Sequence, residues 1–97
     1  MEKRDYLIIL YDYYGELLTP IQQKYFEDYY FNNYTLGEIS ENESISRNAV
    51  HNTLKTIETK LYSYEEKLNL CSKKKELLEL LDKIDNPLIV DKIKKLY

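Results

Sequence analysis

Apolar side chains recur every three or four positions along most of this chain, which is the period of an amphipathic α-helix and not of a β-strand. The first stripe consists of Leu7, Leu10, Tyr11, Tyr14, Leu17 and Leu18. A second helix is predicted to begin after Thr19, because Pro20 in the first turn and Gln22 three residues after the threonine complete a capping box. Its apolar face is expected to carry Ile21, Tyr25 and Tyr29.

A short helix and a long helix follow, separated by a turn. Thr35 and Glu38 form a second capping box, the turn spans residues 42–45, and Ser46 is the next candidate N-cap. The long helix continues to Leu68, and its inward positions are Ala49, Val50, Leu54, Ile57, Leu61, Tyr64 and Leu68. Two helices joined by such a short turn are typical of the helix-turn-helix unit.

Two more helices are predicted at the C-terminal end. Ser72 is a candidate N-cap for a helix over residues 73–84, and Asn86–Pro87 interrupts the pattern before a last short helix. The pattern therefore predicts an all-α fold of about six helices. We expect one helical domain over residues 1–97, with a helix-turn-helix core at 19–70 and a C-terminal helical extension at 73–97.

The C-terminal helices carry more apolar surface than a small solvated helix needs. Their stripes contain Leu77, Leu78, Leu80, Leu81 and Ile84, then Leu88, Ile89, Ile93 and Leu96. One explanation is that both helices fold back on the long helix and cover Leu61, Tyr64 and Leu68. The other is an interface, used by a two-fold homodimer or by another partner protein. The residues predicted to form this interface are Leu77, Leu78, Leu81, Ile89 and Ile93.

The amino-acid composition and the net charge exclude some classes of fold and function. With 97 residues the chain has the size of one domain, and its two glycines and two prolines argue against a β-sandwich or a glycine-rich phosphate loop. The net charge of −3 is unevenly distributed, since residues 1–45 carry −6 and residues 46–97 carry +3. The net positive charge that would favour binding to nucleic acid is therefore confined to the C-terminal half.

The compartment is expected to be the cytoplasm. A single cysteine, Cys71, cannot form an internal disulfide, which is usual in a reducing compartment. The N-terminus is charged, and its apolar run is too short for a signal peptide. Because no segment approaches the ~20 apolar residues of a membrane span, we expect no membrane insertion.

The second helix of the motif presents a polar face that suits nucleic acid. The candidate contact residues are Ser46, Arg47, Asn48, His51, Asn52 and Lys55. An arginine can bind guanine or phosphate bidentately, an asparagine can pair with adenine, and the lysine would contact the backbone. The Ser46 hydroxyl and the helix N-terminus could bind a phosphate.

A plain solvated helix face explains the same residues. Any exposed helix face is polar, and Glu38, Glu41 and Glu43 near the turn would repel phosphates. Catalysis and metal binding are disfavoured, because His51 is the only histidine and no metal-ligand spacing or nucleophile–base pair can be assembled. We therefore predict no catalytic residue, no metal site and no cofactor.

Two known families share these motifs. The stretch from Leu18 to Gln23, together with Tyr34 to Ser40 and Ile45 to Val50, resembles region four of sigma-70-type factors, a promoter-reading helix-turn-helix. A wider resemblance, over residues 6 to about 70, is to the YlxM family of small bacterial proteins. The segments that carry it are 11–19, Tyr29–Tyr30, 34–39, 46–50 and 64–68. The tyrosine-rich N-terminal helix distinguishes this family from ordinary sigma modules.

The YlxM resemblance implies a regulator in co-translational protein targeting, because the family's genes tend to lie beside those of the signal recognition particle GTPase and its receptor. The implied partners are DNA or the particle's RNA, and the GTPase or its receptor. A DNA-binding transcriptional regulator unrelated to targeting is the alternative. One residue departs from the family, since Glu43 stands where an apolar residue is usual. A buried unpaired carboxylate would cost several kcal/mol, so we expect Glu43 to point to solvent.

Overall fold

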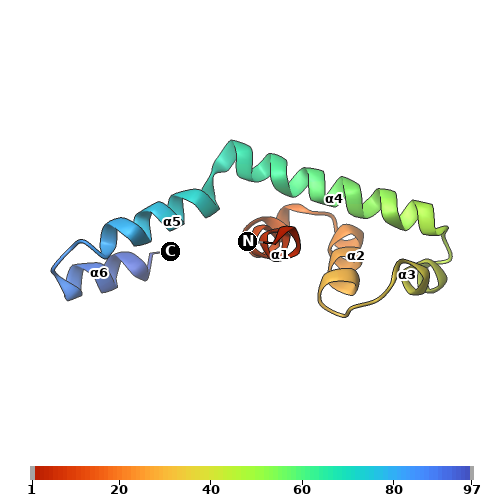
Figure 1. The fold of residues 1–97 in the computed structure, drawn as a ribbon, viewed down its shortest axis with the longest axis horizontal. Helices are drawn as coiled ribbons and strands as arrows, with labels where there is room; N and C mark the ends of the chain where they lie inside the picture. Colours follow the sequence, from red (N-terminus) through yellow and green to blue (C-terminus); the bar gives the residue numbers. More distant parts are fainter. Residues whose placement is uncertain (1, 97) are drawn as a thin grey trace.

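The computed structural model describes residues 2–96, and it consists of helices joined by short connections (Figure 1). The elements in chain order are α1 (Lys3–Tyr14), the 3₁₀ turn η1 (Gly15–Leu17), α2 (Pro20–Tyr30), α3 (Leu36–Glu43), α4 (Arg47–Leu68), α5 (Leu70–Leu81) and α6 (Pro87–Lys94). No strand occurs in the described part of the chain. The predicted all-α fold with six α-helices is confirmed.

The helix starts lie where the capping residues predict. The Thr19 hydroxyl accepts from the amide of Gln22, whose side chain accepts from the Thr19 amide. Thr35 and Glu38 repeat this reciprocal pair at the start of α3. At the start of α4 the hydroxyl oxygen of Ser46 accepts a hydrogen bond from the backbone amide of Ala49, 3.0 Å away. Each cap satisfies amides that a helix start leaves without partners.

Three residues, 44–46, connect α3 to α4. Ser44 adopts a left-handed conformation with φ 56°, which reverses the chain at the end of α3. The amide of Ile45 donates to the Ser40 carbonyl, and the Ser40 hydroxyl donates to the Ile45 carbonyl at 2.5 Å. The turn is therefore fixed from both sides, and the helix-turn-helix is confirmed.

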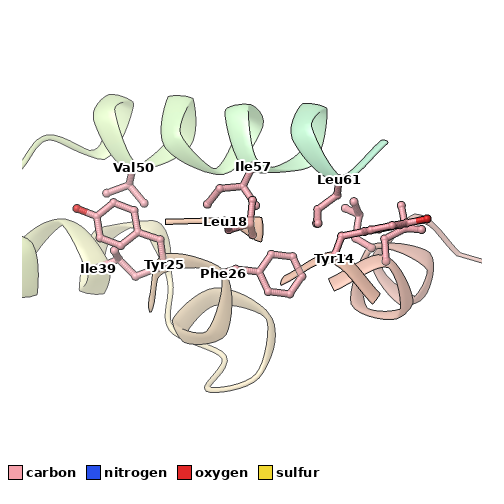
Figure 2. Close-up of a cluster of buried hydrophobic side chains, with 10 residues drawn as sticks. Tyr14, Leu18, Tyr25, Phe26, Ile39, Val50, Ile57 and Leu61 are labelled. Atoms are coloured by element: carbon pink, nitrogen blue, oxygen red, sulfur yellow. The ribbon is translucent and has the colours of Figure 1, made fainter. Parts of the chain in front are cut away.

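The core lies between α4 and the three helices that precede it (Figure 2). Its buried members are Leu7, Leu10, Tyr14, Leu18, Tyr25, Phe26, Ile39, Val50, Ile57 and Leu61. Val50, Ile57 and Leu61, spaced by seven and then four residues, project from the same side of α4, as the helical period predicts. Long α4 thus serves as the common support for α1, α2 and α3.

Three predicted inward positions are wrong: Leu17, Ile21 and Leu68, the last of which is 44% exposed. Leu17 and Ile21 were expected on the apolar face, and both are 56% exposed. Leu17 lies in η1, where the tighter 3₁₀ winding takes it out of the α-helical register of α1. The buried face of α2 is centred on Tyr25 and Phe26 instead.

The junction between α4 and α5 also differs from prediction, because Ser72 does not cap α5. Asn69, left-handed with φ 55°, ends α4, and α5 begins immediately after it. The Glu65 carboxylate accepts hydrogen bonds from the amides of Cys71 and Ser72, and the Tyr14 hydroxyl donates to it at 2.5 Å. A buried side chain of α4 therefore caps α5 in place of a local serine.

This buried cluster shifts the ionisation of its members. Burial, and next the hydrogen bond to Glu65, raise the pKa of Tyr14 to about 12. Outside this cluster, burial also raises the pKa of Tyr11 to about 12, with the hydrogen bond to Glu27 as the second cause. For Glu65 burial acts to raise the pKa, but the hydrogen bonds from Tyr14, Cys71 and Ser72 outweigh it and hold the pKa below its ordinary value.

We expect the protein to lose stability at high pH. A tyrosine with an ordinary pKa of 10.0 when unfolded and about 12 when folded stabilises fully below pH 10, and that contribution is lost as the pH rises toward 12. Denaturant unfolding at increasing pH should show this fall, and Tyr14→Phe should reduce its slope. Exposed Tyr34→Phe is the control. An equal slope in the Tyr14 variant would contradict the assignment.

The last two helices project from the body as an arm (residues 70–96), so the molecule measures 56 × 24 × 24 Å (Figure 1). The possibility that they fold back on α4 is wrong. Leu68 is 44% exposed, whereas Leu61 packs with α1 and Tyr64 lies beside Tyr14. The extra helix α1 thus occupies the face of α4 that the C-terminal helices would have covered.

Candidate nucleic-acid interface

All six residues predicted to contact nucleic acid are exposed on the first turns of α4 or at its cap. They are Ser46, Arg47, Asn48, His51, Asn52 and Lys55. Arg47, His51 and Lys55 follow one another at intervals of four, so they form one row along the helix. Asn48 and Asn52 form the adjacent row. The face is therefore wide enough to present both cationic and amide groups to one ligand.

The start of α4 favours an anion. Its N-terminus carries the positive end of the helix dipole and is bounded by Ser46 and Arg47. The Ser46 oxygen already accepts from the Ala49 amide, so this serine can only donate its hydroxyl hydrogen to a phosphate. Arg47 is consequently the principal candidate contact at this end.

Two of the three nearby carboxylates are engaged in other interactions. The Glu38 carboxylate accepts from the Thr35 amide within the capping box. Glu43 does not point to solvent as expected, because its side chain is 17% exposed and pairs with Lys24 of α2 at 2.5 Å. The ion pair joins α2 to α3 and offsets a charge that would repel phosphates. Of the three, Glu41 is the exposed carboxylate for which neither a hydrogen bond nor an ion pair is found within residues 2–96.

A groove of about 370 Å³ continues the cationic row of α4 toward the N-terminal helix. The charged and titratable residues that line this groove are His51, Lys55 and Glu58 of α4 and Lys3 and Arg4 of α1. Its other lining residues are apolar or aromatic: Leu7, Tyr29, Tyr30, Leu36 and Leu54. The structure thus brings basic groups from positions about fifty residues apart to one surface.

The two N-terminal cations are held in different ways. Lys3 forms an ion pair with Glu58 of α4 at 2.6 Å, and hydrogen bonding to Glu58 is the main cause of its raised pKa. Arg4 donates to the Tyr30 carbonyl at 2.8 Å, with its guanidinium 5.0 Å from the centre of the Tyr30 ring. These contacts fix the guanidinium beside the groove, where its remaining N–H groups can donate to an anion.

Sequence reasoning missed Arg4 because α1 lies outside the helix-turn-helix motif. The only feature of the sequence near Arg4 was its place in the first turn of a predicted helix, and that feature does not indicate a binding site. Its proximity to His51 and Lys55 depends on the packing of α1 against α4, and periodicity does not reveal that packing.

A second groove, about 720 Å³, lies between α1 and α2 and has the opposite character. Its charged lining residues are Asp12, Glu16 and Glu27, beside aromatic Tyr11 and Phe31. A surface with three carboxylates repels nucleic acid. The candidate interface therefore belongs to the α4 side of the molecule.

The predicted protein-interface residues are only partly available. Leu78 and Ile89 are 39% and 50% exposed, and Leu77 and Ile93 are half-buried. Leu81 is 3% exposed, so its prediction as an interface residue is wrong, since it packs inside the arm.

Other chemistry has little support in residues 2–96. No three of His, Cys, Asp and Glu in this range are grouped as metal ligands would be. Burial, followed by the charge of Glu65, raises the pKa of the Cys71 thiol, which reduces its thiolate fraction and nucleophilicity. Within the same range no helix combines the length and hydropathy that crossing a bilayer requires.

Known proteins share this sequence over nearly its full length. The family described as "Putative helix-turn-helix protein, YlxM / p13 like", UPF0122, matches residues 1–96. A UPF0122 protein of Thermoanaerobacter sp. (strain X514) is 51% identical over 79 residues, which are 81% of this chain and 68% of the relative. For a UPF0122 protein of Oceanobacillus iheyensis the values are 48% over 84 residues, 87% and 80%. One from Listeria innocua is 39% identical over 84 residues, with 87% and 76% covered.

Proposed function

Because the chain belongs to the UPF0122 family of YlxM- and p13-like helix-turn-helix proteins, we propose that it is a non-enzymatic regulatory protein that binds DNA through α3 and α4. The family description names a helix-turn-helix and no enzyme. In this proposal the first turns of α4 enter the major groove, and α3 lies across the backbone. A DNA-binding role places the protein in the cytoplasm.

The observation that carries the proposal is the shared cationic surface of α4 and α1. Arg47, His51 and Lys55 form the row on α4, and Arg4 lines the same groove as the last two. In a helix-turn-helix the N-terminal part of the second helix reads base edges, while flanking cations contact phosphates. Arg47 and Asn48 are the proposed base-reading pair, and Lys55 and Arg4 the proposed phosphate contacts.

Duplex DNA fits this surface better than duplex RNA. A helix enters the wide major groove of B-form DNA, whereas the deep, narrow major groove of an A-form RNA helix excludes it. The proposed base readers lie on a helix, Arg47 to Leu68, and not on an aromatic platform of the kind that stacks single-stranded bases.

We expect Arg47→Ala/Lys55→Ala to weaken binding to a mixed-sequence DNA duplex of about 30 base pairs by about fivefold or more. Fluorescence anisotropy between 50 and 200 mM salt measures both the affinity and its salt dependence. Removing two phosphate or base contacts should also reduce the slope of log K against log salt by about 1 to 2.

A matched control comes from the other end of the same helix. Lys67 is exposed in the last turn of α4 and also carries one positive charge. Lys67→Ala should leave the affinity close to that of the unchanged protein, whereas Lys55→Ala should lower it. Equal affinities for the two single variants, or an unchanged affinity for the double variant, would reject this face as the DNA interface.

We further propose that the regulated process is co-translational protein targeting. This finer proposal rests on the resemblance to YlxM proteins and their genetic association with the signal recognition particle GTPase and its receptor. Affinity capture from lysate with and without nuclease is the test. Partners lost after nuclease treatment support a role through DNA or the particle's RNA, whereas retained GTPase or receptor supports direct protein contact and contradicts a purely DNA-mediated role.

A further inference from the structure

The arm (residues 70–96) exposes a concentration of large apolar side chains. Leu70, Leu78, Leu80, Ile84, Leu88, Ile89 and Leu96 are each between 39% and 82% exposed. The contacts that the arm makes with the body come chiefly from α5 against α1. Exposed apolar surface of this kind in a small protein marks an interaction site.

The arm has little internal stabilisation. Helix α5 has 12 residues and α6 has eight, lengths at which an isolated helix is marginal in water. Leu81 is the one side chain that is buried in the described part of the arm. A helical hairpin with so small a core requires another surface to hold it together.

Charge is distributed unevenly along the arm. The chain runs outward along α5, reverses at Asn86–Pro87, and returns along α6 (Figure 1). The base of the arm, next to the body, is therefore basic on balance, with Lys73, Lys74, Lys75, Lys92, Lys94 and Lys95 against Asp91. Toward the tip, the second half of α5 and the connection after it carry Glu76, Glu79, Asp82 and Asp85 with a single cation, Lys83.

We propose that the arm pairs with the arm of a second copy of this chain across a two-fold axis, the two hairpins antiparallel, to form a four-helix bundle. A two-fold interface uses the same patch on both copies, so the patch must complement itself. Antiparallel hairpins place the basic base of each arm against the acidic tip of the other. Parallel hairpins would bring the two basic bases together, which like-charge repulsion disfavours.

The apolar side chains then form the shared core. Leu80 and Ile89 become buried between the hairpins, in the manner of facing helices in a four-helix bundle. Neither the reading face of α4 nor its groove takes part. The dimer interface thus does not overlap the proposed DNA-binding surface, so either proposal can fail without the other.

Sedimentation equilibrium of the full chain at tens of micromolar should give a dimer of the 11.7 kDa protomer. Leu80→Glu/Ile89→Glu should lower the association constant by more than about a hundredfold, since each copy would bury two unpaired carboxylates. Both residues are at least half exposed in the single chain, so the helical content should be unchanged. Leu17→Glu/Ile21→Glu, on exposed apolar residues of the body, is the matched control and should remain dimeric.

Charge reversal tests the antiparallel arrangement. Lys73→Glu/Lys75→Glu/Lys92→Glu/Lys94→Glu leaves two lysines at the base against four new glutamates, so the base becomes acidic and the dimer should weaken. Adding Glu79→Lys/Asp82→Lys reverses the net charge of the tip as well. Association should then be restored, because base and tip again carry opposite charges. A monomeric full chain, or a dimer unaffected by the double glutamate variant, would overturn the proposal. A dimer whose charge-reversed forms are not rescued would overturn the antiparallel pairing.

Discussion

Phe26→Ala is expected to lower the free energy of unfolding by about 3–5 kcal/mol. Phe26 is 1% exposed and stacks between Tyr11 and Tyr30, at centroid distances of 4.2 and 4.3 Å. Truncation removes the ring that joins α1 to α2 beneath α4, and it leaves a cavity that the surrounding rings can close only in part. Urea unfolding followed by circular dichroism measures the change.

The control for Phe26 is the adjacent aromatic ring of Phe31. It contacts the same cluster edge-on, 5.9 Å from Phe26, but is 48% exposed. Phe31→Ala should therefore cost under ~1 kcal/mol. If the two variants were equally stable, the cluster would not be the centre of this core.

Glu65→Ala is the second change with a large expected effect, a loss of about 3 kcal/mol or more. The substitution would leave the Tyr14 hydroxyl and the amides of Cys71 and Ser72 without their acceptor. Each buried polar group left unsatisfied costs roughly 1–3 kcal/mol. Denaturant unfolding measures the total.

Amide hydrogen exchange locates this loss. Exchange at Cys71 and Ser72 should accelerate more than exchange within α2, because the missing carboxylate capped α5. Exposed Glu66→Ala changes the net charge equally and should alter stability by no more than about 0.5 kcal/mol. Unchanged exchange at the start of α5 would show that Glu65 does not hold the junction.

The helix starts were predictable because their signals are local. The boxes at Thr19 and Thr35 and the cap at Ser46 each involve residues three apart, and the structure places all three helices accordingly. The polar face of α4 could be predicted in the same way, because one helix determines which of its own residues lie together. Whether that face binds DNA remains a prediction.

The errors concern interactions between elements. Serine is a common N-cap residue, so the sequence predicted Ser72 as the cap of α5, but the Glu65 carboxylate takes that role. Glu65 is itself held by a hydrogen bond from Tyr14, 51 positions away in the chain. Glu43 had no visible partner in the sequence, and the partner is Lys24 on another helix. Arg4 joined the candidate site only through the packing of α1 on α4. Each depends on which helices meet, which amphipathic periodicity leaves open.

The 22 residues of α4 separate the candidate reading face from the arm by a rigid rod about 33 Å long. Along such a rod, angle is coupled to length, since each residue adds about 100° of rotation and 1.5 Å of rise. One residue inserted near the end of α4 would turn the arm by more than a quarter circle relative to Arg47. In the proposed dimer the two reading faces would then be rotated relative to each other, so they could no longer face the same side of one DNA duplex. Selection on α4 should consequently act on residue number even where it tolerates a change of side chain.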